Sequence, residues 1–163
     1  MSLLIVADTG PLVILAKLDQ LNLLKHLYTE VHLPLTVFNE ATVLAQRTDA
    51  RRVTDFVSKS ATLAPAIECN AKDFIDFGLD AGETQAILLA KQLGCTLLID
   101  ERKGRLVAQQ EHLAVLGTLG LLLKAKQVQL IPTLTPLLEQ MLQNDYRLAP
   151  ALVEKAKELA GEL

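Results

Sequence analysis

The chain has 163 residues, of which 50% are hydrophobic and 4% aromatic, with no Trp, and its formal net charge is -3 at pH 7. This length suits one domain with a sizeable core, and the negative charge excludes a basic protein that coats nucleic acid indiscriminately. The scarcity of aromatic residues argues against a single-strand binder built on stacking platforms, so any RNA contact must be local.

The first 60 residues alternate between strand and helix patterns. The apolar run 3–7 stops at Asp8-Thr9-Gly10-Pro11, which is typical of a buried parallel strand followed by a turn. Pro11 suits the first turn of a helix, and Thr36 is the expected N-cap of a later one. The expected elements are a strand at 3–7, helices at 11–18 and 21–27, a strand at 31–33 ending at Pro34, and helices at 36–46 and 49–60.

The second half continues this alternation after a less legible segment, residues 61–79, in which we expect one strand followed by a stretch with Phe74 and Phe77. Two helices are expected in the tail, joined by Asp145-Tyr146-Arg147. The expected elements are a helix at 80–93 ended by Gly94, a strand at 95–99 stopping at Asp100, a helix at 103–111, a strand at 114–116, and helices at 119–126, 135–144 and 150–163.

Strands that alternate with helices predict an α/β fold with a parallel sheet covered on both faces. We expect a three-layer α/β/α arrangement with a mainly parallel central sheet of four or five strands. Residues 1–163 are expected to form a single domain, with a core at about 3–131 and a C-terminal helical extension at about 132–163.

The two cysteines, Cys69 and Cys95, form no CxxC pair and no zinc-ligand spacing, so we expect a reducing, cytoplasmic setting. The apolar N-terminus lacks the basic lead-in of a signal peptide, and no apolar run approaches the roughly 20 residues that span a bilayer. We therefore expect no membrane partner. The apolar excess must enter a core or a partner interface, and we expect a homo-oligomer.

Two of the expected strands end in an aspartate, Asp8 and Asp100. In open parallel sheets, ligands bind beyond the carboxyl ends of the strands, so both carboxylates are expected at one edge. The alternative is that aspartate follows a strand simply because it favours turns.

Two glutamates occupy inward helix faces. Glu40 lies at or beside the apolar stripe of its helix, and Glu83 shares the apolar face of the helix at 80–93. A carboxylate facing a core is unfavourable unless it is paired or holds a metal. The alternatives are that Glu40 sits at the edge of the stripe and reaches solvent, and that Asp80 and Glu83 form an N-cap with its reciprocal capping residue.

Together these four acids would repel one another unless a cation neutralised them. Hard divalent cations prefer oxygen ligands, lower the pKa of bound water and stabilise charge during attack on phosphate. We therefore predict a Mg²⁺ or Mn²⁺ site and nuclease chemistry. The predicted metal-binding and catalytic residues are Asp8, Glu40, Glu83 and Asp100.

Three cations adjoin the predicted metal site, Arg102, Lys103 and Arg105, and they are expected to bind RNA phosphates. The alternative is a solvated helix start. Other basic residues and the histidines are weaker candidates: an ordinary exposed face accounts for Arg47, Arg51 and Arg52, and no ligand spacing joins His26, His32 and His112.

The order of these motifs resembles PIN domains. It consists of the strand ending in Asp8-Thr9, Leu33-Pro34 followed by Glu40, the helix start at residues 79–83, Leu98-Ile99-Asp100, and the segments 99–105 and 117–120. The strongest likeness is to a PIN-like subfamily of predicted nucleic-acid-binding proteins, and it runs from residue 3 to at least residue 126, with further likeness in the tail.

The resemblance implies a metal-dependent ribonuclease in which the four acids bind Mg²⁺ or Mn²⁺ and Thr9 and Thr118 support them. Relatives among VapC-type toxins are endoribonucleases restrained by an antitoxin, so the resemblance also implies a small antitoxin-like partner. Two features depart from the pattern: Glu83 stands where many PIN toxins carry Asp, and minimal toxins lack the extra C-terminal helices.

Three other enzyme classes fit less well. Asp8-Thr9-Gly10 resembles the aspartic protease triplet, but those folds are nearly all strand. Haloacid dehalogenase phosphatases need a second Asp where Gly10 stands, and no phosphate-loop motif is present. The main alternative from another class is a catalytically silent PIN-like module that binds nucleic acid or protein.

Overall fold

The computed structural model describes residues 3–69 and 78–163, so the predicted segment with Phe74 and Phe77 lies outside the described residues. The strands are β1 (Leu4–Ala7), β2 (Glu30–Pro34), β3 (Ala61–Ala64), β4 (Thr96–Leu98) and β5 (Val115–Leu116). The helices are α1 (Thr9–Lys17), α2 (Asn22–Leu27), α3 (Leu35–Ala41), α4 (Thr48–Ser60), α5 (Ala81–Leu93), α6 (Arg102–Gln110), α7 (Thr118–Gln127), α8 (Thr135–Gln143) and α9 (Pro150–Leu159).

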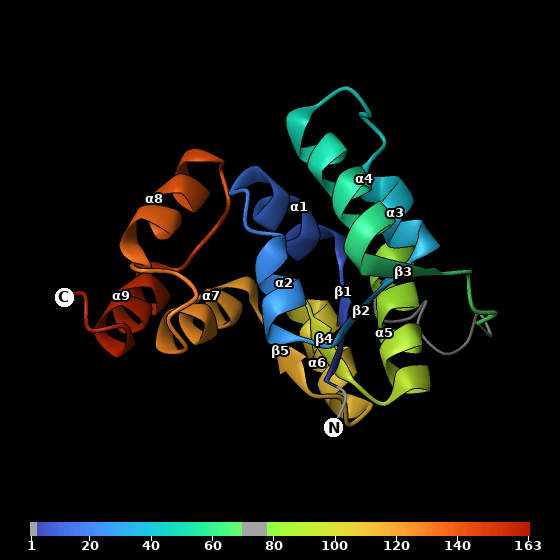
Figure 1. Ribbon diagram of the computed structural model, residues 1–163. Helices are drawn as coiled ribbons and strands as arrows, with labels where there is room; N and C mark the ends of the chain where they lie inside the picture. The colour runs from blue at the N-terminus through green and yellow to red at the C-terminus, as the bar shows by residue number, and fades with distance from the viewer. Residues whose placement is uncertain (1–2, 70–77) are drawn as a thin grey trace.

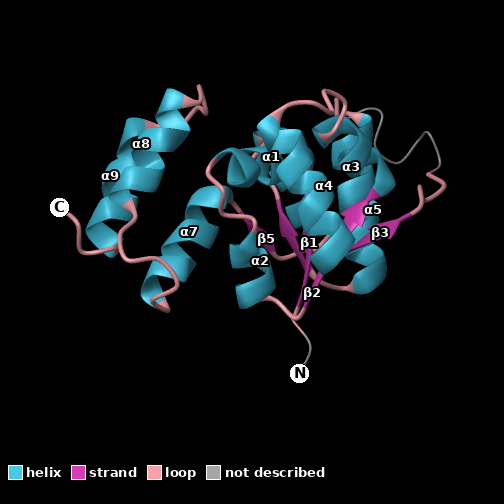
Figure 2. Cartoon of the chain, turned by 45° about the horizontal axis from the view of Figure 1, so that its top comes forward, coloured by secondary structure: helices cyan, strands magenta, loops and turns pink. Residues whose placement is uncertain are grey.

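The strands form one five-stranded sheet in the order β3-β2-β1-β4-β5, and every pair is parallel. This confirms the predicted α/β class. Figure 1 shows the sheet between helices, and Figure 2 shows α7, α8 and α9 gathered at one side of the molecule, away from β3. None of the helices in the described ranges is long and apolar enough to span a bilayer.

The continuous apolar strands follow from burial on both faces of the sheet. Side chains alternate across a strand, so Ile5 and Ala7 join one buried cluster while Val6 joins another. The first cluster also holds side chains from α1, α2, α4 and α7, and the second holds side chains from α5 and α6. These two clusters are the two helix-covered faces of a three-layer fold.

Helix α3 differs from the prediction at both ends. It begins at Leu35 directly after β2, so Pro34 and not Thr36 is the N-cap residue, and it ends at Ala41 and not near Gln46. The Thr42 hydroxyl donates to the Phe38 carbonyl (2.7 Å) at this end. The helix stops here because the next apolar side chains, such as Leu44, are exposed and give further turns no core to pack on.

The C-terminal extension packs on the cluster that holds α1 and α7, through residues such as Leu138 and Met141 of α8 and Ala156 of α9. Helix α9 ends at Leu159 and not at residue 163, and Gly161 (φ +73°) turns the chain back. The Glu162 carboxylate then accepts hydrogen bonds from the backbone N–H groups of Leu134 (2.7 Å) and Thr135 (2.9 Å). A residue near the end of the chain therefore caps the start of α8.

This cap generates a stability prediction. Burial acts to raise the pKa of Glu162, but the hydrogen bonds from Thr135 and Leu134 and the charge of Lys126 hold it below its ordinary value. Glu162→Ala should lower the free energy of unfolding by about 1 kcal/mol, as loss of other N-caps does. Because the folded pKa is depressed, the wild-type advantage should vanish as pH falls through that pKa. Urea unfolding at pH 7 and pH 3 measures this, with exposed Glu158→Ala as the control. Equal losses in the two variants would contradict the cap.

Candidate metal centre

The candidate site lies at the carboxyl ends of β1 and β4, the central neighbours in the sheet. The Asp8 N–H donates to the Leu98 carbonyl (2.9 Å), so the residues that follow these strands emerge side by side. The chain leaves β1 toward one edge of the sheet through β2 and leaves β4 toward the other through β5. Such a switch point is where open α/β sheets bind ligands.

Asp8 is the most deeply buried acid of this edge, with only 5% of its surface exposed. Its Oδ1 atom is buried and has no hydrogen-bond partner among the described residues. Burial, together with the charges of Asp80, Glu40 and Asp100, raises the pKa of its carboxyl to about 7, although a hydrogen bond from the Thr9 N–H acts to lower it. An unpartnered buried carboxylate oxygen is costly, so Asp8 stands where a cation would be favoured.

Glu40 reaches this site from α3, but it is exposed and does not face the core, as the alternative at the edge of the apolar stripe expects. The Thr9 hydroxyl donates to Glu40 Oε2 (2.7 Å). Helix α5 also lies close to Glu40, because a Cβ atom on Gly82 would be 2.6 Å from Glu40 Oε2. A side chain at position 82 would therefore displace the Glu40 carboxylate.

Glu83 lies in the first turn of α5, half-buried. Asp80 caps this helix by accepting a hydrogen bond from the Glu83 N–H (2.7 Å), as the capping alternative requires. The Glu83 side chain nevertheless stays in the acidic site: burial, a hydrogen bond with the Asp80 side chain, and the charges of Asp80, Glu101 and Asp8 raise its pKa to about 8. The capping contact and a place among the acids therefore coexist.

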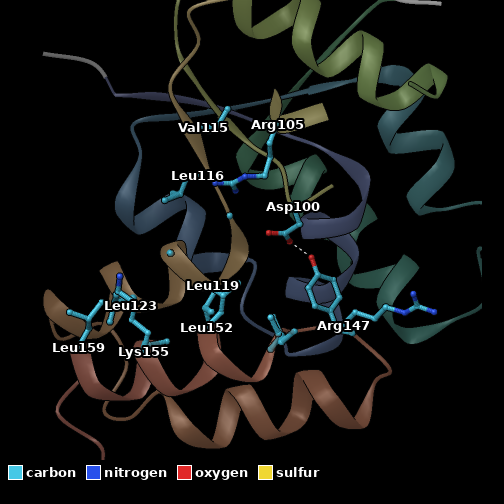
Figure 3. A pocket seen from close by; sticks show the side chains of 16 residues that line it. Asp100, Arg105, Val115, Leu116, Leu119, Leu123, Arg147, Leu152, Lys155 and Leu159 are labelled. Atoms are coloured by element: carbon cyan, nitrogen blue, oxygen red, sulfur yellow. Dashed lines mark hydrogen bonds between the residues drawn. The ribbon is translucent and has the colours of Figure 1, made fainter. Parts of the chain in front are cut away.

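Asp100 follows β4 and is held by three donors. Its Oδ1 accepts from the Thr118 N–H (2.8 Å), and its Oδ2 accepts from the Thr118 hydroxyl (2.6 Å) and the Tyr146 hydroxyl. Figure 3 shows Asp100 with Arg105 close by. Burial raises the pKa of Asp100, whereas the Thr118 hydrogen bonds and the Arg105 charge oppose the rise.

The structure thus brings the four predicted acids together around Asp8. Glu40 and Asp100 act electrostatically on Asp8, and Asp8 acts on Glu83. As the side chains stand, however, the described residues contain no group of three His, Cys, Asp or Glu side chains arranged to hold an ion. The all-oxygen donor set and the unpartnered Asp8 Oδ1 fit a hard divalent cation, provided that the other carboxylates turn toward it.

The three basic residues that follow Asp100, which we call the basic flank, differ in exposure. Arg102 and Lys103 are exposed in the first turn of α6, which leaves them accessible to phosphate. Arg105 is half-buried, and its guanidinium donates to the Ile99 carbonyl (3.0 Å). Arg105 therefore also anchors the chain beside Asp100.

Residues outside the predicted set also contribute to the site. Asp80 was considered only as a helix cap, yet it also adds negative charge beside Asp8. Tyr146 was placed only in the connection between tail helices, and no local pattern indicates that its hydroxyl reaches Asp100, 46 residues away in the sequence.

A family model described as PIN domain matches residues 4–162. The match spans nearly the whole chain, including the C-terminal helices. No curated protein matches the sequence.

The raised pKa of Asp8 predicts how the metal-free protein responds to pH. Its folded pKa of about 7 lies above the ordinary 3.8, so the folded state binds the proton more tightly and loses stability as pH rises between these values. Asp8→Asn removes this loss. The melting temperature of Asp8→Asn relative to wild type should therefore increase from pH 5 to pH 8 in EDTA.

The control is Asp55→Asn, which changes an exposed acid of α4 paired with Lys59. Its melting temperature relative to wild type should stay nearly constant over the same range. A difference between Asp8→Asn and wild type that does not change with pH would contradict the assignment.

Proposed function

Because the chain belongs to the PIN-domain family, whose members are generally nucleases, we propose that it is an endoribonuclease dependent on Mg²⁺ or Mn²⁺. The observation that carries this proposal is the buried Asp8 carboxylate, whose free oxygen faces the switch point of the sheet among the other acids. A divalent cation is the ligand that this cluster of negative oxygen atoms would favour most.

In this proposal Asp8, Glu40, Glu83 and Asp100 hold the metal. A bound Mg²⁺ or Mn²⁺ supplies an acidified water and neutralises charge at the phosphate. Thr9 orients Glu40 and Thr118 orients Asp100 through the hydrogen bonds already described. Exposed Arg102 and Lys103 bind backbone phosphates beside the site, and Arg105 stabilises the segment that carries Asp100.

The likeness to VapC-type toxins extends the proposal to a cytoplasmic toxin restrained by a small antitoxin-like protein, acting as a homo-oligomer. A second candidate function is a PIN-like binding module without turnover. One observation favours it: Asp100 already accepts three hydrogen bonds, one of them from Tyr146. The enzyme and the binding module are separated by cleavage assays on variants of the acids.

Glu83→Gln gives the sharpest cleavage test. The Asp80 cap acts on the backbone N–H of residue 83, so this substitution leaves the cap intact, and it replaces a negative oxygen ligand by an amide that can still hydrogen-bond with the Asp80 side chain. Mn²⁺-dependent cleavage of a mixed RNA pool should fall by at least about 100-fold in Glu83→Gln and in Asp8→Asn, while both variants stay folded in metal-free buffer.

The matched control is Glu111→Gln, which changes a glutamate paired with Lys91. It should cleave at the wild-type rate. Equal cleavage by all variants would indicate a contaminant or another site, and no cleavage by wild type on several RNAs would favour the binding module.

The basic flank predicts a salt effect. Removing two phosphate contacts with Arg102→Gln and Lys103→Gln should weaken binding of single-stranded RNA in EDTA. The slope of log Kd against log salt should flatten by about 0.7 for each lost contact. Fluorescence anisotropy over a salt series measures this slope, with Arg51→Gln and Lys59→Gln on α4 as the charge-matched control. Unchanged binding at low salt would show that RNA approaches by another face.

A further inference from the structure

A groove of about 500 Å³ adjoins the acidic site and is lined by residues of the segment 115–123 and of the C-terminal extension. Figure 3 shows Asp100 and Arg105 at one end of it, Lys155 and Leu159 at the other, and Leu119 and Leu152 between them. The groove therefore runs from the proposed metal site along α7 and α9. Its volume lies within the roughly 300–1,000 Å³ of pockets that bind small molecules.

The chemistry of the groove combines an apolar floor with cationic side chains. Leu119 and Leu152 form part of the floor, Tyr146 contributes an aromatic ring, and Arg105, Arg147 and Lys155 contribute positive charge. Among the described residues that line the groove, Asp100 is the only acid, and its carboxylate already accepts three hydrogen bonds. Basic residues thus outnumber acidic ones among the described residues that line the groove, although the whole chain carries a net charge of -3.

Tyr146 is placed firmly at the Asp100 end. Asp145 adopts the left-handed conformation (φ +58°) after α8, the Tyr146 N–H donates to the Met141 carbonyl (3.0 Å), and the Asp145 N–H donates to the Leu142 carbonyl (3.1 Å). These two bonds form a Schellman motif. The backbone of Tyr146 is therefore held by the end of α8 while its hydroxyl is held by Asp100.

We propose that this groove is a nucleotide subsite that binds the stretch of single-stranded RNA next to the phosphate cleaved at the acidic site. A base would stack on Tyr146 against the leucine floor, and Arg147 and Lys155 would bind the phosphates on either side. Stacking on an aromatic ring with cations along the backbone is how proteins bind single strands without reading their sequence. The proposal rests on the proposed function, because it is the ribonuclease site that the groove extends.

Charge and continuity favour RNA over a protein partner here. The groove shares Asp100 and Arg105 with the acidic site, so a strand whose phosphate reaches the acids must continue into an adjoining surface. An amphipathic protein segment could also pack on exposed Leu152 and Leu159. Binding of such a segment would not account for the continuity of the groove with the acidic site. Protein binding is therefore an outcome of the test and not the proposal.

The test measures binding of a fluorescein-labelled single-stranded RNA in EDTA, so that cleavage plays no part. Tyr146→Ala, Leu152→Glu and Lys155→Glu should each weaken binding about tenfold. Tyr146→Phe keeps the ring and removes the hydroxyl, so it should weaken binding less than Tyr146→Ala. Leu152 and Lys155 are exposed, so these substitutions should not unfold the protein.

Matched controls come from the same extension. Lys157→Glu makes the same charge change two residues from Lys155, and Leu142→Glu makes the same change as Leu152→Glu at a leucine that is 49% exposed. Neither position lines the groove, and both variants should bind RNA within about twofold of wild type. RNA carrying a photoreactive uridine should crosslink to the segment 146–159, identified by mass spectrometry.

The outcomes separate this proposal from the nuclease assignment. Groove variants that bind and crosslink like wild type overturn the subsite and leave the groove to a protein partner, even if wild type cleaves RNA. Weakened binding in the groove variants alone supports the subsite, even if wild type shows no cleavage and the nuclease assignment fails. Equal weakening in Lys157→Glu and Leu142→Glu also overturns the subsite, because added negative charge anywhere on the extension would then explain the weaker RNA binding.

Discussion

The buried carboxylate of Asp8 is the constraint on which the rest of the site depends. Its Oδ1 has no partner among the described residues, and its pKa is raised to about 7 by burial and by three neighbouring acids. Such a group opposes folding whenever it is ionised without a counter-charge. The surrounding elements nevertheless hold more acids toward it, an arrangement that a cation bound to the folded protein would stabilise.

The same edge depends on the far end of the chain. Glu162 caps α8, the end of α8 fixes Tyr146 through a Schellman motif, and the Tyr146 hydroxyl contacts Asp100. Together these contacts link the last residues of the chain to the end of β4. The C-terminal extension is therefore part of the site's construction, and the groove beside Asp100 exists because α9 packs along α7.

The strands and the positions of Asp8 and Asp100 at the strand ends could be predicted because the sequence patterns that indicate them are local. Unbroken apolar runs indicated strands buried on both faces, and parallel strands put their carboxyl ends at one edge, which is why Asp8 and Asp100 meet. Glu83 was predicted for a related reason, since helical spacing determines the face it occupies. The capping contact that competed with this assignment is also real, because Asp80 accepts a hydrogen bond from the backbone N–H of residue 83 and also interacts with the Glu83 side chain.

Other features depend on tertiary contacts that no local pattern carries. The helix holding Glu40 was predicted too long, because the apolar pattern past Ala41 belongs to side chains that stay exposed. Glu40 itself is exposed and is positioned by Thr9 and the close approach of Gly82, which are distant in sequence. The contact between Tyr146 and Asp100 was missed because a tyrosine in a connection between helices gives no indication of its target.

The most direct measurement of the central claim is anomalous diffraction from crystals soaked in Mn²⁺. The account predicts an anomalous peak within coordination distance of Asp8 Oδ1, with Glu40, Glu83 or Asp100 turned to share it, and no peak there in crystals of Asp8→Asn. A folded wild-type protein with no Mn²⁺ at Asp8, or with Mn²⁺ bound only elsewhere, would contradict it.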